Sequence, residues 1–301
     1  MANTIPAGLQ NNIIAQSALE QFTSIMAPLS AFSTSFNGDA AQRGKTIDIV
    51  NLSNTNSAAD FGGTYSAQNT EYGTSQITLD KHKFVTWHVT DTESSQSSAV
   101  ELQRFGYQKG GDLAKAIFQD VLSSITAANF GNGAGDKLVV AATDFDADEV
   151  ANLRAKGFAQ DCYPDQMGLI LNNDYFTSLL KDNSLAHAMN YGSAEVVQGG
   201  RVPSLFGIKG IYESNAIPTN SQNLVGFYTD PSALVIAMRY LQPLNTGEYI
   251  ATRRLTDPTT GITMGYREYY EPSTGTQTAI LESVYGYSVG VWQNLIRLLS
   301  A

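Results

Sequence analysis

The sequence SSAVELQRFGYQKGGDLAKAIFQDVLSSITAANF, residues 97–130, predicts one long amphipathic helix. Ser98 and Glu101 have the spacing of a capping box at its start, and Gly131 and Gly133 follow its last turn. At 1.5 Å per residue, roughly 30 helical residues span about 45 Å, which is long for a globular protein. An apolar stripe recurs every four residues along one side of this helix, at Leu113, Ile117, Val121 and Ile125.

Three glycines, Gly106, Gly110 and Gly111, fall in the first half of this helix. Each one destabilises a helix by roughly 1 kcal/mol relative to Ala, so we expect a bend or a local irregularity there. Sequence rich in strands and turns flanks the helix on both sides. This arrangement is more typical of an extended scaffold subunit than of a compact enzyme.

The composition indicates a protein with a substantial core and few surface charges. Of the 301 residues, 43% are hydrophobic, enough for one elaborate domain or two or three subdomains. Only 15% are charged, which favours a subunit covered by copies of itself; a β-rich protein with a neutral polar surface is the alternative. The net charge of −10 argues against a broad basic face for nucleic acid, but does not exclude a protein that merely surrounds DNA.

The sequence carries no disulfide, export or membrane signal. Cys162 is the single cysteine, so no intrachain disulfide can form, and folding in a reducing cytoplasm is expected. Residues 1–10, MANTIPAGLQ, lack the basic and apolar regions of a signal peptide. No apolar run approaches the roughly 20 residues that a membrane span needs, so no membrane partner is expected.

The first 90 residues predict an arm followed by a projection. Residues 14–25 suggest a short helix that ends near Pro28, and residues 46–50 alternate like a strand. Residues 51–75 are mostly Asn, Ser, Thr and Gly; a polar loop of this length is typical of an interaction loop. Residues 76–90 alternate as one long returning strand. Loop and strand together predict a two-stranded projection that needs support from outside itself.

After the long helix, short strands alternate with short helices and Gly-rich loops. Strands are expected within residues 138–142, 167–171, 208–213, 224–228, 233–238 and 246–301. One helix is expected at residues 147–156, begun by Asp146 and Glu149 and ended by Gly157. A second helix is expected at residues 173–181.

This order of elements resembles the major capsid proteins of tailed bacteriophages with the Hong Kong 97-type fold. The resemblance covers nearly the whole chain and depends on the sequence of elements, since no single motif is diagnostic. It is carried by GKTIDI at 44–49, LDKHKFVTWHVTDTE at 79–93, the 97–130 helix, PDQMGLILNNDYFTSLLKD at 164–182, SLFGIKGIYESNAIP at 204–218 and FYTDPSALVIAMR at 227–239.

The resemblance implies an α+β fold with five parts. They are an N-terminal arm and entry strand at 1–50, an extended loop at 51–91, a peripheral domain at 92–183 with a spine helix at 97–130, an axial domain at 184–239, and a β return of the peripheral domain with the C-terminal segment at 240–301.

The resemblance also implies a non-enzymatic shell subunit. Such proteins form pentamers and hexamers that close into an icosahedral container for double-stranded DNA, which they enclose without sequence-specific binding. The expected partners are copies of the chain itself, a separate scaffolding protein, a portal and a decoration protein. The expected location is the virion capsid, assembled in the host cytoplasm.

Ten residues are candidate assembly contacts on this interpretation. Those on the loop and its returning strand are Phe61, Tyr65, Tyr72, Lys81 and Lys83. Those farther along the chain are Arg201, Arg253, Arg254, Asp257 and Arg267. Arg253, Arg254 and Arg267 favour charge pairing with acidic faces of neighbouring subunits, with solvated or salt-bridged side chains as the alternative. Some members of the family cross-link a loop lysine to an asparagine of a neighbour, but Lys81 and Lys83 are expected to be solvated or paired.

Possible catalytic, cofactor-binding and metal-binding patterns are weak, so we expect none of these sites. The G-x-S-x-G pattern at 286–290 matches a hydrolase nucleophile elbow around Ser288, but no acid or histidine follows it. An acidic run at 144–149 departs from the calcium-loop pattern and fits a helix start better. His82 and His88 lie about 20 Å apart on one strand, too far to bind one metal. Cys162 lacks basic neighbours and is expected to be buried.

Three alternative functions remain open from the sequence. An encapsulin-like nanocompartment shell would share the fold and bind a protein cargo on its inner surface. A serine hydrolase would use Ser288 as its nucleophile. A phage tail or surface-adhesion module would give tubes or monomers.

Overall fold

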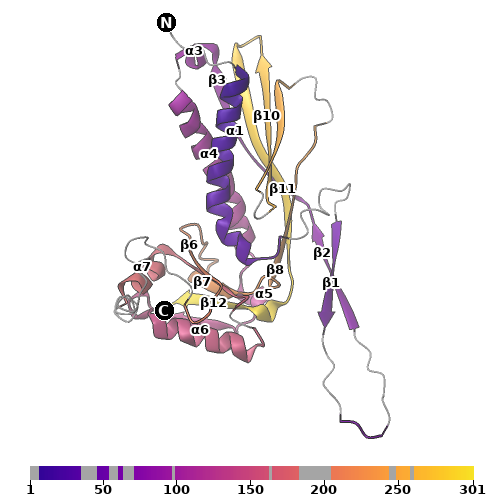
Figure 1. The fold of residues 1–301 in the computed structure, drawn as a ribbon, viewed down its shortest axis with the longest axis vertical. Helices are drawn as coiled ribbons and strands as arrows, with labels where there is room; N and C mark the ends of the chain where they lie inside the picture. The colour runs from indigo at the N-terminus through magenta and orange to yellow at the C-terminus, as the bar shows by residue number, and fades with distance from the viewer. Residues whose placement is uncertain are drawn as a thin grey trace.

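The computed structural model describes residues 7–34, 46–53, 60–63, 71–96, 99–162, 165–182, 205–243, 249–257 and 261–301. Two long helices, α1 (Ala7–Met26) and α4 (Ala99–Leu122), run side by side in the same direction (Figure 1). The 3-10 turn η1 (Ala27–Ala31) follows α1 and contains Pro28, which confirms the predicted end of the first helix. No helix in the described part of the chain is long and apolar enough to cross a bilayer.

The first sheet lies beside the two long helices. Its order is β3 (Lys81–Thr90), β11 (Thr276–Val289), β10 (Thr263–Glu271), β9 (Ala251–Thr256), and β8 (Leu234–Arg239) also pairs with β11. All of these pairings are antiparallel. The inward side chains Trp87, Met264, Tyr266 and Leu281 share one core with the apolar sides of α1 and α4.

The second sheet joins segments that lie far apart in the sequence. Its order is β4 (Lys137–Val140), β12 (Leu295–Ser300), β7 (Leu224–Thr229), β5 (Gly168–Leu171), β6 (Gly210–Glu213). Helices α6 (Ala147–Ala159) and α7 (Asn173–Lys181) pack on this sheet over a second core that includes Val150, Leu153, Phe176 and Leu179. The sheet therefore combines strands from the predicted ranges 92–183, 184–239 and 240–301.

The predicted long strand at residues 76–90 is two strands that belong to different sheets. β2 (Glu71–Thr78) pairs antiparallel with β1 (Thr46–Ser53), whereas β3 leaves this hairpin and pairs with β11. Leu79 and Asp80 form the link between them. The alternating pattern runs through both strands because Ile77 and Leu79 are both buried at the junction.

The long helix is shorter than predicted and is not interrupted by its glycines. α4 ends at Leu122, and after a turn a separate short helix, α5, covers Ala127–Phe130. Ser98 of the predicted capping box lies outside the described residues. The expected irregularity is absent, since α4 is continuous through these positions. Gly106 and Gly110 lie against α1, and a Cβ on either residue would collide with backbone atoms of α1. The glycines therefore permit close helix packing.

The smaller predicted elements agree with the structure in most places. β5 and α7 match their predicted positions, and α6 begins where predicted because Asp146 accepts hydrogen bonds from the N–H groups of Asp148 and Glu149. Gly157 does not end α6, which continues to Ala159. A Cβ added at Gly157 would lie 2.8 Å from the ring of Tyr228, so this glycine provides room for an aromatic side chain of β7.

Candidate assembly surface

The hairpin of β1 and β2 is the part of the molecule that extends farthest from the two sheets. The strands pair over eight residues, from Thr46 opposite Thr78 to Ser53 opposite Glu71, and project away from the body (Figure 1). Beyond them, the described residues 60–63 are all exposed, and Phe61 keeps 64% of its surface exposed. A two-stranded hairpin alone is marginally stable in water, so this projection is suited to gain support from another molecule.

The root of the hairpin is fixed to the body by a small apolar cluster. Ile77 is fully buried and Leu79 nearly so, and they pack with Val235, Ala237 and Val284 of β8 and β11. The backbone of β2 also lies directly on β11 at Gly286, where a Cβ would overlap the carbonyl oxygen of Thr78. Only glycine allows this approach.

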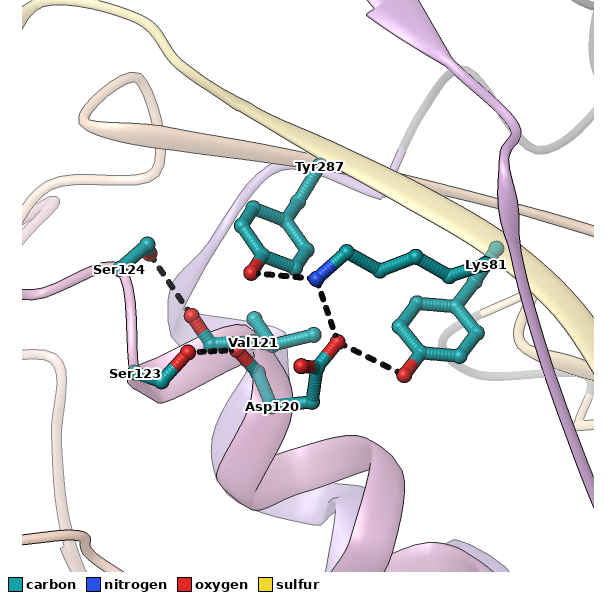
Figure 2. Close-up of polar contacts among 7 residues, drawn as sticks. Lys81, Asp120, Val121, Ser123, Ser124 and Tyr287 are labelled. Carbon is teal, nitrogen blue, oxygen red and sulfur yellow. Dashed lines mark hydrogen bonds and ion pairs between the residues drawn. The ribbon is translucent and has the colours of Figure 1, made fainter.

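A polar network attaches the start of β3 to the last turn of α4. The Lys81 Nζ lies 2.8 Å from Asp120 Oδ2 and 2.8 Å from the Tyr287 hydroxyl oxygen (Figure 2). Its ammonium group also lies 4.4 Å from the centre of the Tyr287 ring, a cation–π distance. The Tyr285 hydroxyl donates to the same oxygen of Asp120 at 2.8 Å. Three elements, β3, α4 and β11, therefore meet at one partly buried ion pair.

The charges of this pair stabilise each other in spite of their burial. Burial opposes ionisation of Asp120, but the hydrogen bonds from Lys81 and Tyr285 outweigh it and hold the pKa of the carboxyl below its ordinary value. Burial likewise disfavours the charged form of Lys81, yet its bonds to Asp120 and Tyr287 raise the pKa of the ammonium group. Both groups therefore stay charged at neutral pH.

We expect Lys81→Met and Asp120→Asn each to reduce the free energy of unfolding by about 1–2 kcal/mol, since hydrogen bonds to partly exposed charges are lost. A double-mutant cycle from urea unfolding measures their coupling. Lys115→Met, at an exposed position of α4, is the control and changes stability by less than about 0.5 kcal/mol. The pKa of Asp120 is lower in the folded protein than its ordinary value of 3.8. The stabilisation is therefore complete above pH 3.8 and is lost as the pH falls through the pKa of the folded state. Zero coupling near pH 7 contradicts the network.

The structure places the predicted contact residues of the loop and its returning strand in different surroundings. Phe61 is exposed beyond the hairpin, and Tyr72 lies on β2. Tyr65 lies outside the described residues. Lys83 is half-buried on β3, and Lys81 is bound within its own chain.

The predicted contact residues of the later segments also divide into two groups. Arg253 and Arg254 are exposed on β9, at the edge of the first sheet. Arg267 pairs with Glu282 at 2.5 Å, and its side chain is only 11% exposed. Asp257 is buried, and its backbone closes the turn between β9 and β10. Arg201 lies outside the described residues. The contacts of these residues with other subunits stay a prediction.

The weak catalytic and metal patterns have structural explanations. Ser288 lies within β11 opposite Val235, in a continuous strand, where a nucleophile elbow requires a turn into a helix. Burial raises the pKa of the Cys162 thiol to about 11, with smaller contributions from Asp230 and Asp161, so it is protonated at neutral pH. Among the described residues, no three His, Cys, Asp or Glu side chains are grouped to bind a metal ion.

Sequence reasoning missed the root of the hairpin. The sequence assigns Gly286 to a hydrolase-like pattern or to a strand of small residues, although a glycine inside a long strand commonly marks a close backbone approach. Asp120 lies in the last turn of α4 and is not among the residues that the sequence patterns single out. Nothing in the sequence connects it to Lys81, Tyr285 and Tyr287, which come from distant segments.

No family model and no curated protein matches the sequence. Several solved structures have a similar fold. One is from Mycobacterium phage Che8, with 15% identity, 90% of each chain covered and a TM-score of 0.58. Another is from the mature capsid of bacteriophage PhiM1, with 12% identity, 87% of this chain and 84% of that chain covered, and a TM-score of 0.58. A third is the capsid of the cyanophage P-SCSP1u, with 13% identity, coverage of 86% and 84%, and a TM-score of 0.56.

Proposed function

We propose that this chain, which has the α+β Hong Kong 97-type fold of tailed-phage capsid proteins, is a major capsid protein. The predicted fold is confirmed by its similarity to phage capsid structures over nearly the whole chain. Copies of the chain assemble through pentamers and hexamers into an icosahedral shell. That shell encloses double-stranded DNA and forms the outside of the virion, after assembly in the host cytoplasm.

The observation that carries this proposal is the hairpin of β1 and β2. It projects from a body that already buries two cores without it, and it presents an exposed aromatic residue, Phe61, beyond its strands. A projection that contacts a different surface on the next copy makes a heterologous contact, and such a contact repeated around an axis closes a ring. In a shell, each hairpin would gain its missing support from the neighbouring subunit.

The net negative charge of the chain supports a shell that encloses DNA without binding it strongly. With 28 acidic and 18 basic residues, the subunit has no general attraction for a polyanion. DNA inside such a shell would be confined by the wall, with little direct binding. The division into peripheral and axial domains, and the scaffolding, portal and decoration partners, belong to the same proposal.

Electron microscopy of the purified, concentrated chain tests this function. We expect closed, roughly spherical particles built from rings of five and six subunits, with the yield rising with protein concentration. Tubes, or monomers under every salt and concentration tried, would contradict the proposal. Closed particles that bind a protein cargo on their inner surface and package no DNA in infected cells would instead identify a nanocompartment.

A further inference from the structure

Residues 219–223, at the end of the connection from β6 to β7, form a turn with an unusual backbone. Asn220, Ser221 and Asn223 have φ angles of 51°, 54° and 53°, in the left-handed region. This region is strained for residues with a Cβ, although Asn tolerates it better than most. The N–H groups of Gln222 and Leu224 both donate to the carbonyl oxygen of Thr219, at 2.9 and 3.1 Å. Three such residues in one turn persist only where the surroundings stabilise them.

One side of this turn is bound to the end of the long helix. The side-chain amide of Asn220 donates to the carbonyl oxygens of Leu122 and Ile125, at 2.9 and 2.7 Å. These carbonyls lie where α4 stops and lacks further helical donors. The side-chain oxygen of Gln222 accepts a hydrogen bond from the N–H of Ala127 at 3.0 Å, at the start of α5. The turn therefore bridges the connection between α4 and α5.

The other side of the turn is bound to the second sheet. Arg297 of β12 is 1% exposed, and its Nη1 donates to the same oxygen of Gln222 at 2.5 Å. Its Nη2 donates to the carbonyl oxygen of Gly131 at 2.6 Å. The carbonyl oxygen of Asn223 accepts from the N–H of Ser300 at 2.9 Å. A buried guanidinium is costly unless hydrogen-bonded, so these partners are strongly constrained.

We propose that residues 219–223 form a clasp that locks the end of α4 onto β12, with Asn220 and Gln222 as the positioning residues. The clasp fixes the orientation of the long helix and the first sheet relative to the second sheet. Its consequence for assembly rests on the proposed function: in a shell of identical subunits, this internal angle recurs in every copy and contributes to the curvature of the wall.

Hydrogen–deuterium exchange on the intact chain tests the clasp. Asn220→Gly keeps the left-handed backbone and removes the amide, and Gln222→Ala removes the shared acceptor. We expect each to increase exchange of the amides at residues 122–127 by about tenfold, while amides of β5 exchange as before. Ser221→Gly is the matched control: it relieves strain, keeps both side-chain contacts, and leaves exchange at 122–127 unchanged or slower.

The outcomes separate this inference from the proposed function. Unchanged exchange at residues 122–127 in both Asn220→Gly and Gln222→Ala overturns the clasp, whether or not shells form. Faster exchange in both variants supports the clasp even if the unmodified chain never assembles. Failure of the unmodified chain to assemble would count only against the capsid role. If shells do form, Asn220→Gly is expected to broaden the distribution of particle diameters relative to Ser221→Gly, and identical distributions would overturn the link to curvature.

Discussion

Removal of residues 54–70 is expected to leave a folded subunit that no longer forms closed shells. In this variant an Asn-Gly turn joins Ser53 to Glu71, the last pair of the hairpin, so both strands keep their register. The body is expected to remain stable because the buried Ile77 and Leu79 at the root are unchanged. On the proposed function, assembly is lost because the variant lacks the loop proposed to contact the neighbouring subunit.

Sedimentation velocity and electron microscopy measure this loss, and thermal unfolding checks the fold. We expect shells to fall below detection while the melting temperature of the dispersed subunit changes by no more than a few degrees. Phe61→Ser in the full-length chain is the matched control for the exposed aromatic residue, and it is expected to lower the yield of shells without abolishing them. Normal shells from the shortened chain would show that residues 54–70 are not needed for assembly.

Gly110→Ala is expected to reduce the free energy of unfolding by about 3 kcal/mol. The added Cβ would overlap the carbonyl oxygen of Ala18 and lie 2.8 Å from its Cα. These are backbone atoms, so no side chain can rotate out of the way. α1 would have to move away from α4, which would open the core around Ala18 and Phe22.

Gly111→Ala provides the control for this experiment one residue farther along the helix. The nearest atoms to an added Cβ would belong to the side chains of Gln21 and Ile25, at 3.4 Å. The substitution is therefore expected to stabilise the protein by up to about 1 kcal/mol through helix propensity. Denaturant unfolding of both variants measures the difference. Equal stabilities of the two variants would mean that α1 and α4 approach no more closely at Gly110 than at Gly111.

Local patterns in the chain were sufficient to predict many of its elements and their order. The start of α6 at Asp146, the position of α7, and the end of the first helix near Pro28 depend on neighbouring residues alone, and all agree with the structure. The capsid fold itself was predicted from the resemblance of the order of these elements to a known family.

Contacts between distant segments were decided only by the tertiary structure. Residues 76–90 alternate without a break, so the change of partner between β2 and β3 had no local signal. The chain before Leu79 pairs with β1 and the chain after it pairs with β11, and both partners come from other parts of the sequence. The glycines of α4 looked like helix-weakening residues because their cost is local, whereas their benefit depends on the position of α1. Asp120, Asn220 and Arg297 owe their roles to partners many residues away. Propensity and pattern act over a few residues, while burial and pairing depend on which segments the whole fold brings together.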